Sequence, residues 1–189
     1  MTPKPVFGPT ALLTPANVLT IIRIFSSAGL VALVVSDTEW WAFCMFIAIG
    51  ITDNIDGMLA RRQGTTRSGA FLDPLADKVY IGSVAVTLAV QDKLSWAIVS
   101  LLLSREILVS IFRSWAAGRG GSVPASAWGK LKTFVTVVGL GALLLPVSWS
   151  EIYGHLLLWV AVALAWISAA GYLRRAPSYT EKGPSIDVG

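Results

Sequence analysis

Charge is scarce in this sequence of 189 residues. Only 14% of the residues are Asp, Glu, Lys or Arg and 54% are hydrophobic, with a mean hydropathy of +0.68. Soluble domains carry about 25% charged residues, so an ordinary soluble domain, a disordered segment and a nucleic-acid-binding protein are excluded. A membrane-spanning helix takes about 20 apolar residues, and the chain therefore has room for about six spans and little else.

Cysteine and histidine are almost absent. Cys44 is the single cysteine and lies in an apolar run, which excludes a disulfide framework and a cysteine-based metal site. His155 is the single histidine, so an imidazole-rich zinc site is excluded as well.

Six apolar runs with short connections predict an all-α protein, an antiparallel bundle of six transmembrane helices. Lys and Arg gather in alternate loops and after the last run, which predicts that both termini and those loops face the cytoplasm. Residues 1–16, rich in proline, are expected to form a loop or interfacial segment, 17–175 the helical domain, and 176–189 a polar tail. The predicted spans are Val18–Ser36, Trp40–Leu59, Phe71–Val90, Leu94–Ala117, Trp128–Val147 and Ile152–Tyr172.

Four carboxylates lie at the facing ends of the second and third runs, where a membrane protein rarely places charge. Left unpaired at bilayer depth, they would cost on the order of 10 kcal/mol. Within each run the acids are three or four residues apart, on one helix face, and the short connection predicts antiparallel neighbouring helices. Such an oxygen-only site suits a hard divalent cation, Mg²⁺ or Mn²⁺. The four acids are Asp53, Asp56, Asp73 and Asp77.

Small and basic residues accompany the aspartates at fixed spacing. Gly57 follows Asp53 by four residues, and its missing side chain leaves room for a ligand against the backbone. Arg61, one turn further on, is suited to clamping a phosphate, and Gly69 opens the facing helix as Gly57 does. The whole pattern is Asp53-x2-Asp56-Gly57-x2-Ala60-Arg61-x7-Gly69-x3-Asp73-x3-Asp77.

This pattern resembles the signature of the CDP-alcohol phosphotransferase family, membrane enzymes with six helices around a polar cavity. The resemblance implies that two divalent metal ions bind the four aspartates and that Asp77 is also the general base. It further implies that the nucleotide and diphosphate of the donor are held by Asn17, Thr20, Gly57, Arg61, Thr66 and Gly69. Asn17 and Thr66 are also ordinary helix-capping or turn residues, which is the alternative for those two.

Flanking stretches narrow the resemblance to the bacterial phosphatidylglycerophosphate synthases; they are residues 17–23, 66–78, 104–107 and 129–133. The resemblance implies phosphatidyl transfer from CDP-diacylglycerol to sn-glycerol 3-phosphate, with release of CMP, by a homodimer in the bacterial cytoplasmic membrane. Inositol phosphate or phosphatidylglycerol as acceptor stays open. A carboxylate-lined cation or proton transporter is the alternative from another class of protein.

Charged residues of the later runs predict a second anion site, for the phosphate of the acceptor. Arg105 and Glu106 lie in mid-span, where charge is costly unless it is paired or functional. The alternative is a basic rim that binds anionic lipid headgroups. The predicted pocket comprises Arg23, Arg105, Glu106, Arg113, Lys130 and Lys132.

Overall fold

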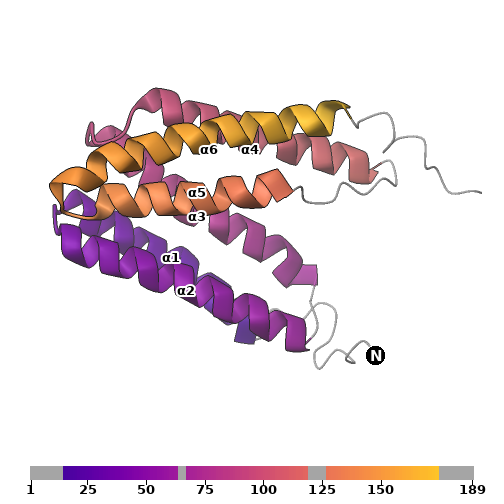
Figure 1. Ribbon diagram of the computed structural model, residues 1–189. Coiled ribbons are helices and arrows are strands. Elements are labelled where there is room, and N and C mark those ends of the chain that lie inside the picture. The colour runs from indigo at the N-terminus through magenta and orange to yellow at the C-terminus, as the bar shows by residue number, and fades with distance from the viewer. Residues whose placement is uncertain (1–14, 64–66, 119–126, 175–189) are drawn as a thin grey trace, which may run out of the picture.

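The computed structural model describes residues 15–63, 67–118 and 127–174, and within these ranges it describes the side chains except those of 15–17, 53–74 and 172–174. This part of the chain is helical and contains no strand, so the predicted all-α class is confirmed. Successive helices run in opposite directions, and α1 begins at the same end of the bundle at which α6 ends (Figure 1). The helices are α1 (Pro15–Val35), α2 (Glu39–Gln63), α3 (Arg67–Val90), α4 (Trp96–Gly118), α5 (Ala127–Leu144) and α6 (Ser148–Arg174).

Several helix ends differ from the predicted spans; α6 begins at Ser148, four residues before the predicted Ile152, and α1 at Pro15, three residues before Val18. Helix α5 ends at Leu144, before the predicted Val147, because Pro146 has no backbone N–H and disfavours a helical conformation in the residue before it. Helices α2 and α3 each extend four residues further toward each other than predicted, to Gln63 and from Arg67. Those added residues are polar or small, so a search for apolar runs does not include them.

The turns α1–α2 and α3–α4 share one backbone motif at the end of the bundle opposite the termini. Asp37 and Asp92 take positive φ values of 52° and 57°. The N–H of Thr38 donates to the carbonyl of Leu33 at 3.2 Å, and that of Lys93 to the carbonyl of Leu88 at 2.9 Å. These are the long hydrogen bonds of Schellman motifs, which satisfy the last carbonyls of α1 and α3. We call this the turn end of the bundle.

Side chains tie the two turns to each other. The ammonium of Lys93 lies 3.1 Å from a carboxylate oxygen of Asp37 and 3.3 Å from one of Glu39. Partial burial acts to lower the pKa of Lys93, but the hydrogen bonds and charges of these two carboxylates raise it above its usual value. The amide of Gln91 also donates to the carbonyl of Val34 at 2.9 Å.

The packing divides the bundle into two groups of helices. Helix α1 packs against both α2 and α3, while α5 and α6 form a close hairpin with α4 against α6. Contacts of α2 with α5, and of α3 with α4 and α5, join the groups. In Figure 1 the lower group, α1 to α3, diverges from the upper group toward the right. The shared core includes Leu30, Phe46, Val84, Leu88, Ile98, Leu140 and Leu158.

Small residues permit the close crossing of α5 and α6. A Cβ atom added to Gly154 would lie 2.7 Å from Cδ2 of Leu143 and 3.1 Å from the carbonyl oxygen of Gly139. A Cβ added to Gly139 would lie 2.9 Å from Cγ of Leu158. All three distances are shorter than van der Waals contact, so this hairpin requires glycine at both positions.

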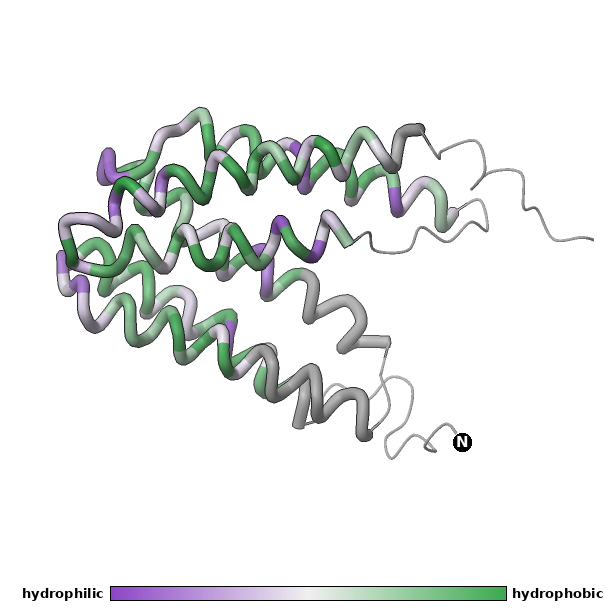
Figure 2. The backbone as a smooth tube through the Cα atoms, viewed as in Figure 1, coloured by the Kyte–Doolittle hydropathy of each residue, from purple (hydrophilic) through white to green (hydrophobic). Residues whose placement is uncertain are grey.

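Within the residues that the structure describes, three helices are long and apolar enough to cross a membrane: Val18–Val35 in α1, Ala127–Leu144 in α5 and Ser148–Gly171 in α6. Large apolar side chains also face outward on them, among them Phe25, Phe134 and Ile152. Figure 2 shows hydrophobic residues along most of each described helix, with hydrophilic residues at the turn end and at a few positions nearer the termini. The chain is therefore a membrane protein.

Candidate functional site

Helix α1 carries a polar stretch inside the bundle. Thr20, Arg23 and Ser27 are buried and follow one another at helical spacing, on the face that continues into the core residues Leu30 and Val34. The side chain of Arg23 is only 1% exposed. Burying a guanidinium is costly without a partner, so this face of α1 is expected to meet an acid.

That acid is Asp77 of α3. Nη1 of Arg23 lies 3.3 Å from Oδ1 of Asp77, whose side chain is 51% exposed. The pair joins a buried cation to a carboxylate that keeps an accessible face. Asp77 is the one predicted metal ligand whose side chain the structure describes, and Arg23, predicted in the acceptor pocket, lies beside it.

Tyr80, about one helical turn after Asp77 on α3, links α3 to α2. Its hydroxyl donates to the carbonyl of Phe46 at 2.7 Å, and the two rings pack with their centroids 5.1 Å apart. A Cβ added to Gly50 would lie 3.7 Å from the same hydroxyl. Because Asp77 precedes Tyr80 by three residues, it lies on the same side of α3 as Tyr80, whose hydroxyl reaches α2, and its carboxylate lies against Arg23 of α1.

The remaining residues predicted for the metal and the donor lie outside the described side chains. Positions 53, 56, 57 and 61 are on α2, positions 69 and 73 on α3 and position 17 on α1, all within helix. Thr66 lies outside the described residues altogether. Among the side chains that are described, no three potential metal ligands lie together.

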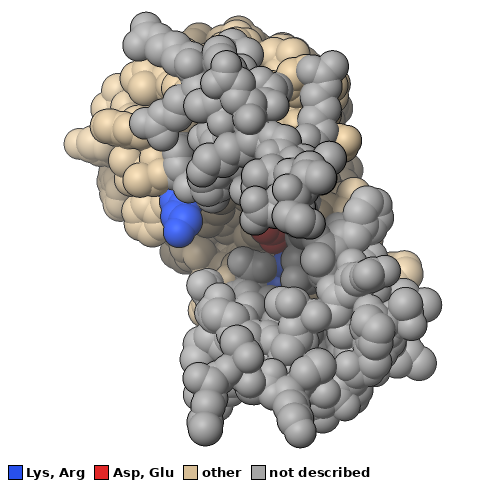
Figure 3. Space-filling model, turned by 90° about the vertical axis from the view of Figure 1, so that its right-hand side faces the viewer, with Lys and Arg blue, Asp and Glu red and all other residues tan. Residues whose placement is uncertain are grey.

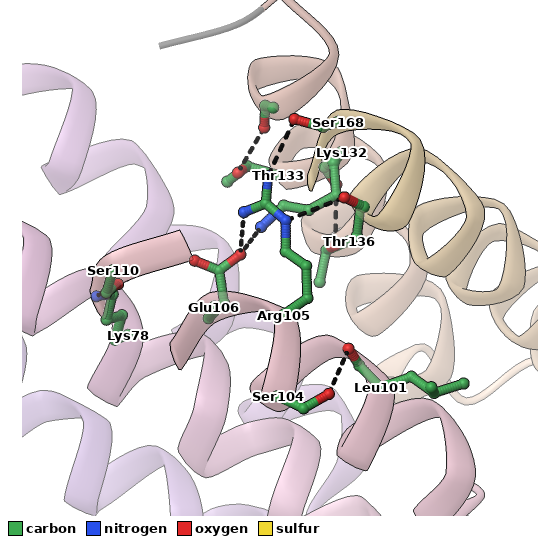
Figure 4. A network of polar contacts seen from close by, with 12 residues as sticks. Lys78, Leu101, Ser104, Arg105, Glu106, Ser110, Lys132, Thr133, Thr136 and Ser168 are labelled. Atoms are coloured by element: carbon green, nitrogen blue, oxygen red, sulfur yellow. Dashed lines mark hydrogen bonds and ion pairs between the residues drawn. The ribbon is translucent and has the colours of Figure 1, made fainter. Parts of the chain in front are cut away.

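A second polar cluster lies in the other group of helices, around Arg105 of α4 (Figure 4). Its Nε donates to the carbonyl of Ala165 at 3.1 Å and its Nη2 to Oγ of Ser168 at 3.0 Å, both on α6. Its Nη1 lies 3.0 Å from Oε1 of Glu106, and the same oxygen accepts a hydrogen bond from Nζ of Lys132 on α5. We call Arg105, Glu106 and Lys132 the α4 cluster.

The α4 cluster combines two buried cations with one partly exposed acid. Side-chain exposure is 6% for Arg105, 11% for Lys132 and 30% for Glu106. One carboxylate balances one of the two cations, so the cluster retains an excess of one positive charge. An excess positive charge beside an accessible surface attracts anions.

The structure brings three of the six residues predicted for the acceptor together in the α4 cluster. Arg113 and Lys130 are exposed, and Arg23 lies at Asp77. The two groups of helices meet near the cluster through Lys78 of α3, whose Nζ donates to Oγ of Ser110 on α4 at 2.7 Å. Figure 3, a view onto the end at which α1 begins and α6 ends, shows charged atoms of both signs near the middle of that face.

Sequence reasoning missed the partners that hold these charges. Ser168 and the carbonyl of Ala165 lie some sixty positions along the chain from Arg105, and Ser110 is one of four serines in α4. A serine in an apolar helix most often bonds its own backbone. Nothing in the sequence distinguishes Ser110 or Ser168 from such a residue.

Fold and site together define a membrane protein with charged clusters buried in two helix groups of one bundle. The family model for CDP-alcohol phosphatidyltransferases matches residues 13–167. The chain belongs to this family and is an enzyme of this class. Divalent metal ions are in general use in the family.

Three relatives illustrate the similarity. A protein of Mycobacterium tuberculosis strain H37Rv called "Probable phosphatidylglycerophosphate synthase" is 38% identical over 169 residues, 85% of this chain and 80% of the relative. The "CDP-diacylglycerol--glycerol-3-phosphate 3-phosphatidyltransferase" of Escherichia coli K12 is 37% identical over 85% of this chain and 93% of its own. The protein of that name from Haemophilus influenzae is 38% identical over 76% and 78%.

Proposed function

We propose that this enzyme transfers the phosphatidyl group from CDP-diacylglycerol to sn-glycerol 3-phosphate, yielding phosphatidylglycerophosphate and CMP. The names of relatives at 37–38% identity support this reaction. The observation that carries it is the excess positive charge of the α4 cluster, because an anionic acceptor needs such a site and a neutral alcohol does not. The proposal includes six membrane-spanning helices, a homodimer, and a cytoplasm-facing site in the bacterial cytoplasmic membrane.

The four aspartates form an oxygen-only donor set that fits two divalent ions, Mg²⁺ or Mn²⁺. Support comes from the contact of Tyr80 with Phe46 and Gly50, because positions 46, 50, 53 and 57 follow one stripe of α2. Positions 80, 77 and 73 likewise follow one stripe of α3. In this proposal Asp53, Asp56, Asp73 and Asp77 hold the ions, which neutralise the diphosphate and polarise its phosphorus when bound.

The chain's own residues then orient the donor and move the proton. Asp77 accepts the proton of the acceptor's 1-hydroxyl as that oxygen bonds to the β-phosphorus of the donor. The bond from this phosphorus to the bridging oxygen breaks, and CMP leaves with the electron pair. Arg23 fixes the carboxylate of Asp77 on the α1 side. The proposed donor-binding residues are Asn17, Thr20, Gly57, Arg61, Thr66 and Gly69.

In this proposal the phosphate of the acceptor binds to basic side chains of α4 and α5. The α4 cluster provides Arg105 and Lys132, which Glu106 holds in place. Arg113 follows Glu106 by seven residues on the same stripe of α4, and Lys130 precedes Lys132 on α5. These side chains bind the phosphate as charge-assisted donors while the hydroxyl end of the acceptor reaches toward Asp77. Arg23 lies beside Asp77, the proposed base, where the proposed donor-binding and acceptor-binding residues meet.

A panel of acceptors tests this function. Purified protein in lipid vesicles is given CDP-diacylglycerol and Mg²⁺ or Mn²⁺, and CMP release is measured with each acceptor in turn. The panel consists of glycerol 3-phosphate, inositol phosphate, serine and phosphatidylglycerol. We expect product with glycerol 3-phosphate and release only at background level with the others. Product with one of the others alone would refute the assignment of the acceptor.

A further inference from the structure

Lys78 holds an unusual position between the two helix groups. It follows Asp77 directly on α3, yet its ammonium lies against the hydroxyl of Ser110 on α4, 2.7 Å away. Among the described side chains no carboxylate lies within ion-pair distance of Lys78, so its charge is held by a neutral group. Because the hydroxyl of Ser110 is neutral, it does not neutralise the ammonium of Lys78, which can still bind an anionic ligand.

A single stripe of α4 connects Lys78 with Lys132. Ser110 follows Glu106 by four residues, so both lie on one face of the helix. Lys78 meets this face from α3, and Lys132 meets it from α5. In the view of Figure 4, Glu106 lies between the Lys78–Ser110 pair and Lys132. The two ammonium groups therefore approach the same surface of α4 from two different helices.

The spacing of the two contacts suits one phosphate group. Four residues of helix rise about 6 Å, and a phosphate that accepts a charge-assisted hydrogen bond of about 2.8 Å on each side spans such a gap. Glu106 and Ser110 are both partly exposed, and Lys78 is exposed, so this stripe is accessible. Lys78 also adds a second excess positive charge to the one carried by the α4 cluster.

We propose that Lys78 is a binding residue for the phosphate of the acceptor, acting together with Lys132 across the Glu106–Ser110 stripe. Ser110 is then a positioning residue, because it holds the ammonium of Lys78 over that stripe. This inference rests on the proposed function and adds to it a basic residue on α3. Lys78 and Asp77 are consecutive on α3 but face α4 and α1 respectively, so the phosphate of the acceptor would be bound on the α4 side of the helix that carries the base.

Steady-state kinetics of the full-length protein in vesicles test the proposal. We expect Lys78→Gln to raise the KM for glycerol 3-phosphate about tenfold or more, because a charge-assisted hydrogen bond is lost, and to leave the KM for CDP-diacylglycerol within twofold. Lys78→Arg should retain most of the affinity. Ser110→Ala should raise the same KM a few-fold at nearly unchanged kcat. The matched control is Ser104→Ala, since the Ser104 hydroxyl bonds the carbonyl of Leu101 in its own helix.

The double variant of Lys78→Gln and Ser110→Ala distinguishes two possible roles of Ser110. It either positions Lys78 or contributes to acceptor binding independently of Lys78. If Ser110 acts through Lys78, adding Ser110→Ala to Lys78→Gln should raise the KM no further. Thermal unfolding gives a readout without turnover: glycerol 3-phosphate should raise the Tm of the parent and of Ser104→Ala but not that of Lys78→Gln. An unchanged acceptor KM in Lys78→Gln, or a rise confined to CDP-diacylglycerol, would overturn the proposal. The second result would assign Lys78 to the diphosphate of the donor.

The parent protein distinguishes a failure of this inference from a failure of the proposed function. If the parent releases CMP with inositol phosphate rather than glycerol 3-phosphate, the proposed acceptor is wrong, and the same variants are compared with inositol phosphate. A higher KM for inositol phosphate in Lys78→Gln would support a phosphate-binding role for Lys78. If the parent uses only an acceptor without a phosphate monoester, the inference fails together with the function.

Discussion

The two ends of the bundle use their charges in opposite ways. At the turn end, Lys93 pairs with Asp37 and Glu39 on the surface, between two turns whose backbone hydrogen bonds are already complete. Toward the other end, Arg23, Arg105 and Lys132 are buried, Arg23 against Asp77 and the other two against the single carboxylate of Glu106. Exposed ion pairs contribute little to stability, whereas a buried charge is costly unless it serves a purpose. Substitutions at the turn end should therefore affect stability slightly, and those toward the termini should affect catalysis.

The largest expected effect is on turnover, at Asp77. Asp77→Asn removes the proposed base and one metal ligand, and we expect kcat to fall by about 10²–10⁴-fold. We also expect a lower Tm, because the buried guanidinium of Arg23 loses this carboxylate. The measurement is CMP release under saturating substrates. Asp92→Asn at the turn end is the matched control, since Asn tolerates the positive φ of that residue. A near-normal rate in Asp77→Asn would show that the base is another group.

The next largest effect is expected on the stability of the fold, at the crossing of α5 and α6. Gly154→Ala places a Cβ against Leu143 and the backbone of Gly139, and we expect a loss of about 1–3 kcal/mol in stability. Unfolding in mixed micelles with increasing SDS measures it. Gly171→Ala in the same helix is the control, because an added Cβ there meets nothing within 4 Å. Equal stability of the two variants would show that the hairpin relaxes to accept the methyl group.

A smaller effect is expected on substitution of Tyr80, which links the hydrophobic core to the proposed active site. Tyr80→Phe keeps the ring against Phe46 but removes the hydrogen bond to the Phe46 carbonyl. We expect a loss of about 1 kcal/mol in stability and a several-fold lower kcat, because the spacing of the metal-binding helices is less well fixed. Raising the Mg²⁺ concentration should recover part of the rate. If kcat is unchanged while stability falls, the contact supports the core alone.

Sequence patterns predicted the six helices because each contains a long apolar run, and Pro146 could have indicated the early end of α5. The added turns of α2 and α3 were missed because their polar and small residues add little to hydropathy. The acceptor pocket was predicted from charges alone. Which of those charges meet depends on how α3, α4, α5 and α6 pack, so neither the Arg23–Asp77 pair nor the contact of Arg105 with Ser168 is readable from spacing.

The smallest effect is expected at Lys93, where the comparison of the two ends is most direct. Lys93→Met should cost less than about 1 kcal/mol near neutral pH, because the ion pairs are solvent-exposed, and leave kcat unchanged. The pKa of Lys93 is raised in the folded protein, so its contribution is fully present below the unfolded pKa of about 10.4. It disappears as the pH rises through the higher folded-state pKa.

Unfolding titrations at pH 7 and at strongly alkaline pH therefore separate this contribution from the rest of the bundle. The parent should lose slightly more stability than Lys93→Met between the two conditions, and the two should converge once Lys93 is neutral. Such a small, titratable contribution fits turns that are already closed by their own backbone hydrogen bonds. A loss of several kcal/mol at neutral pH would mean that Lys93, and not the backbone motif, holds the turn end together, and the contrast between the two ends would no longer hold.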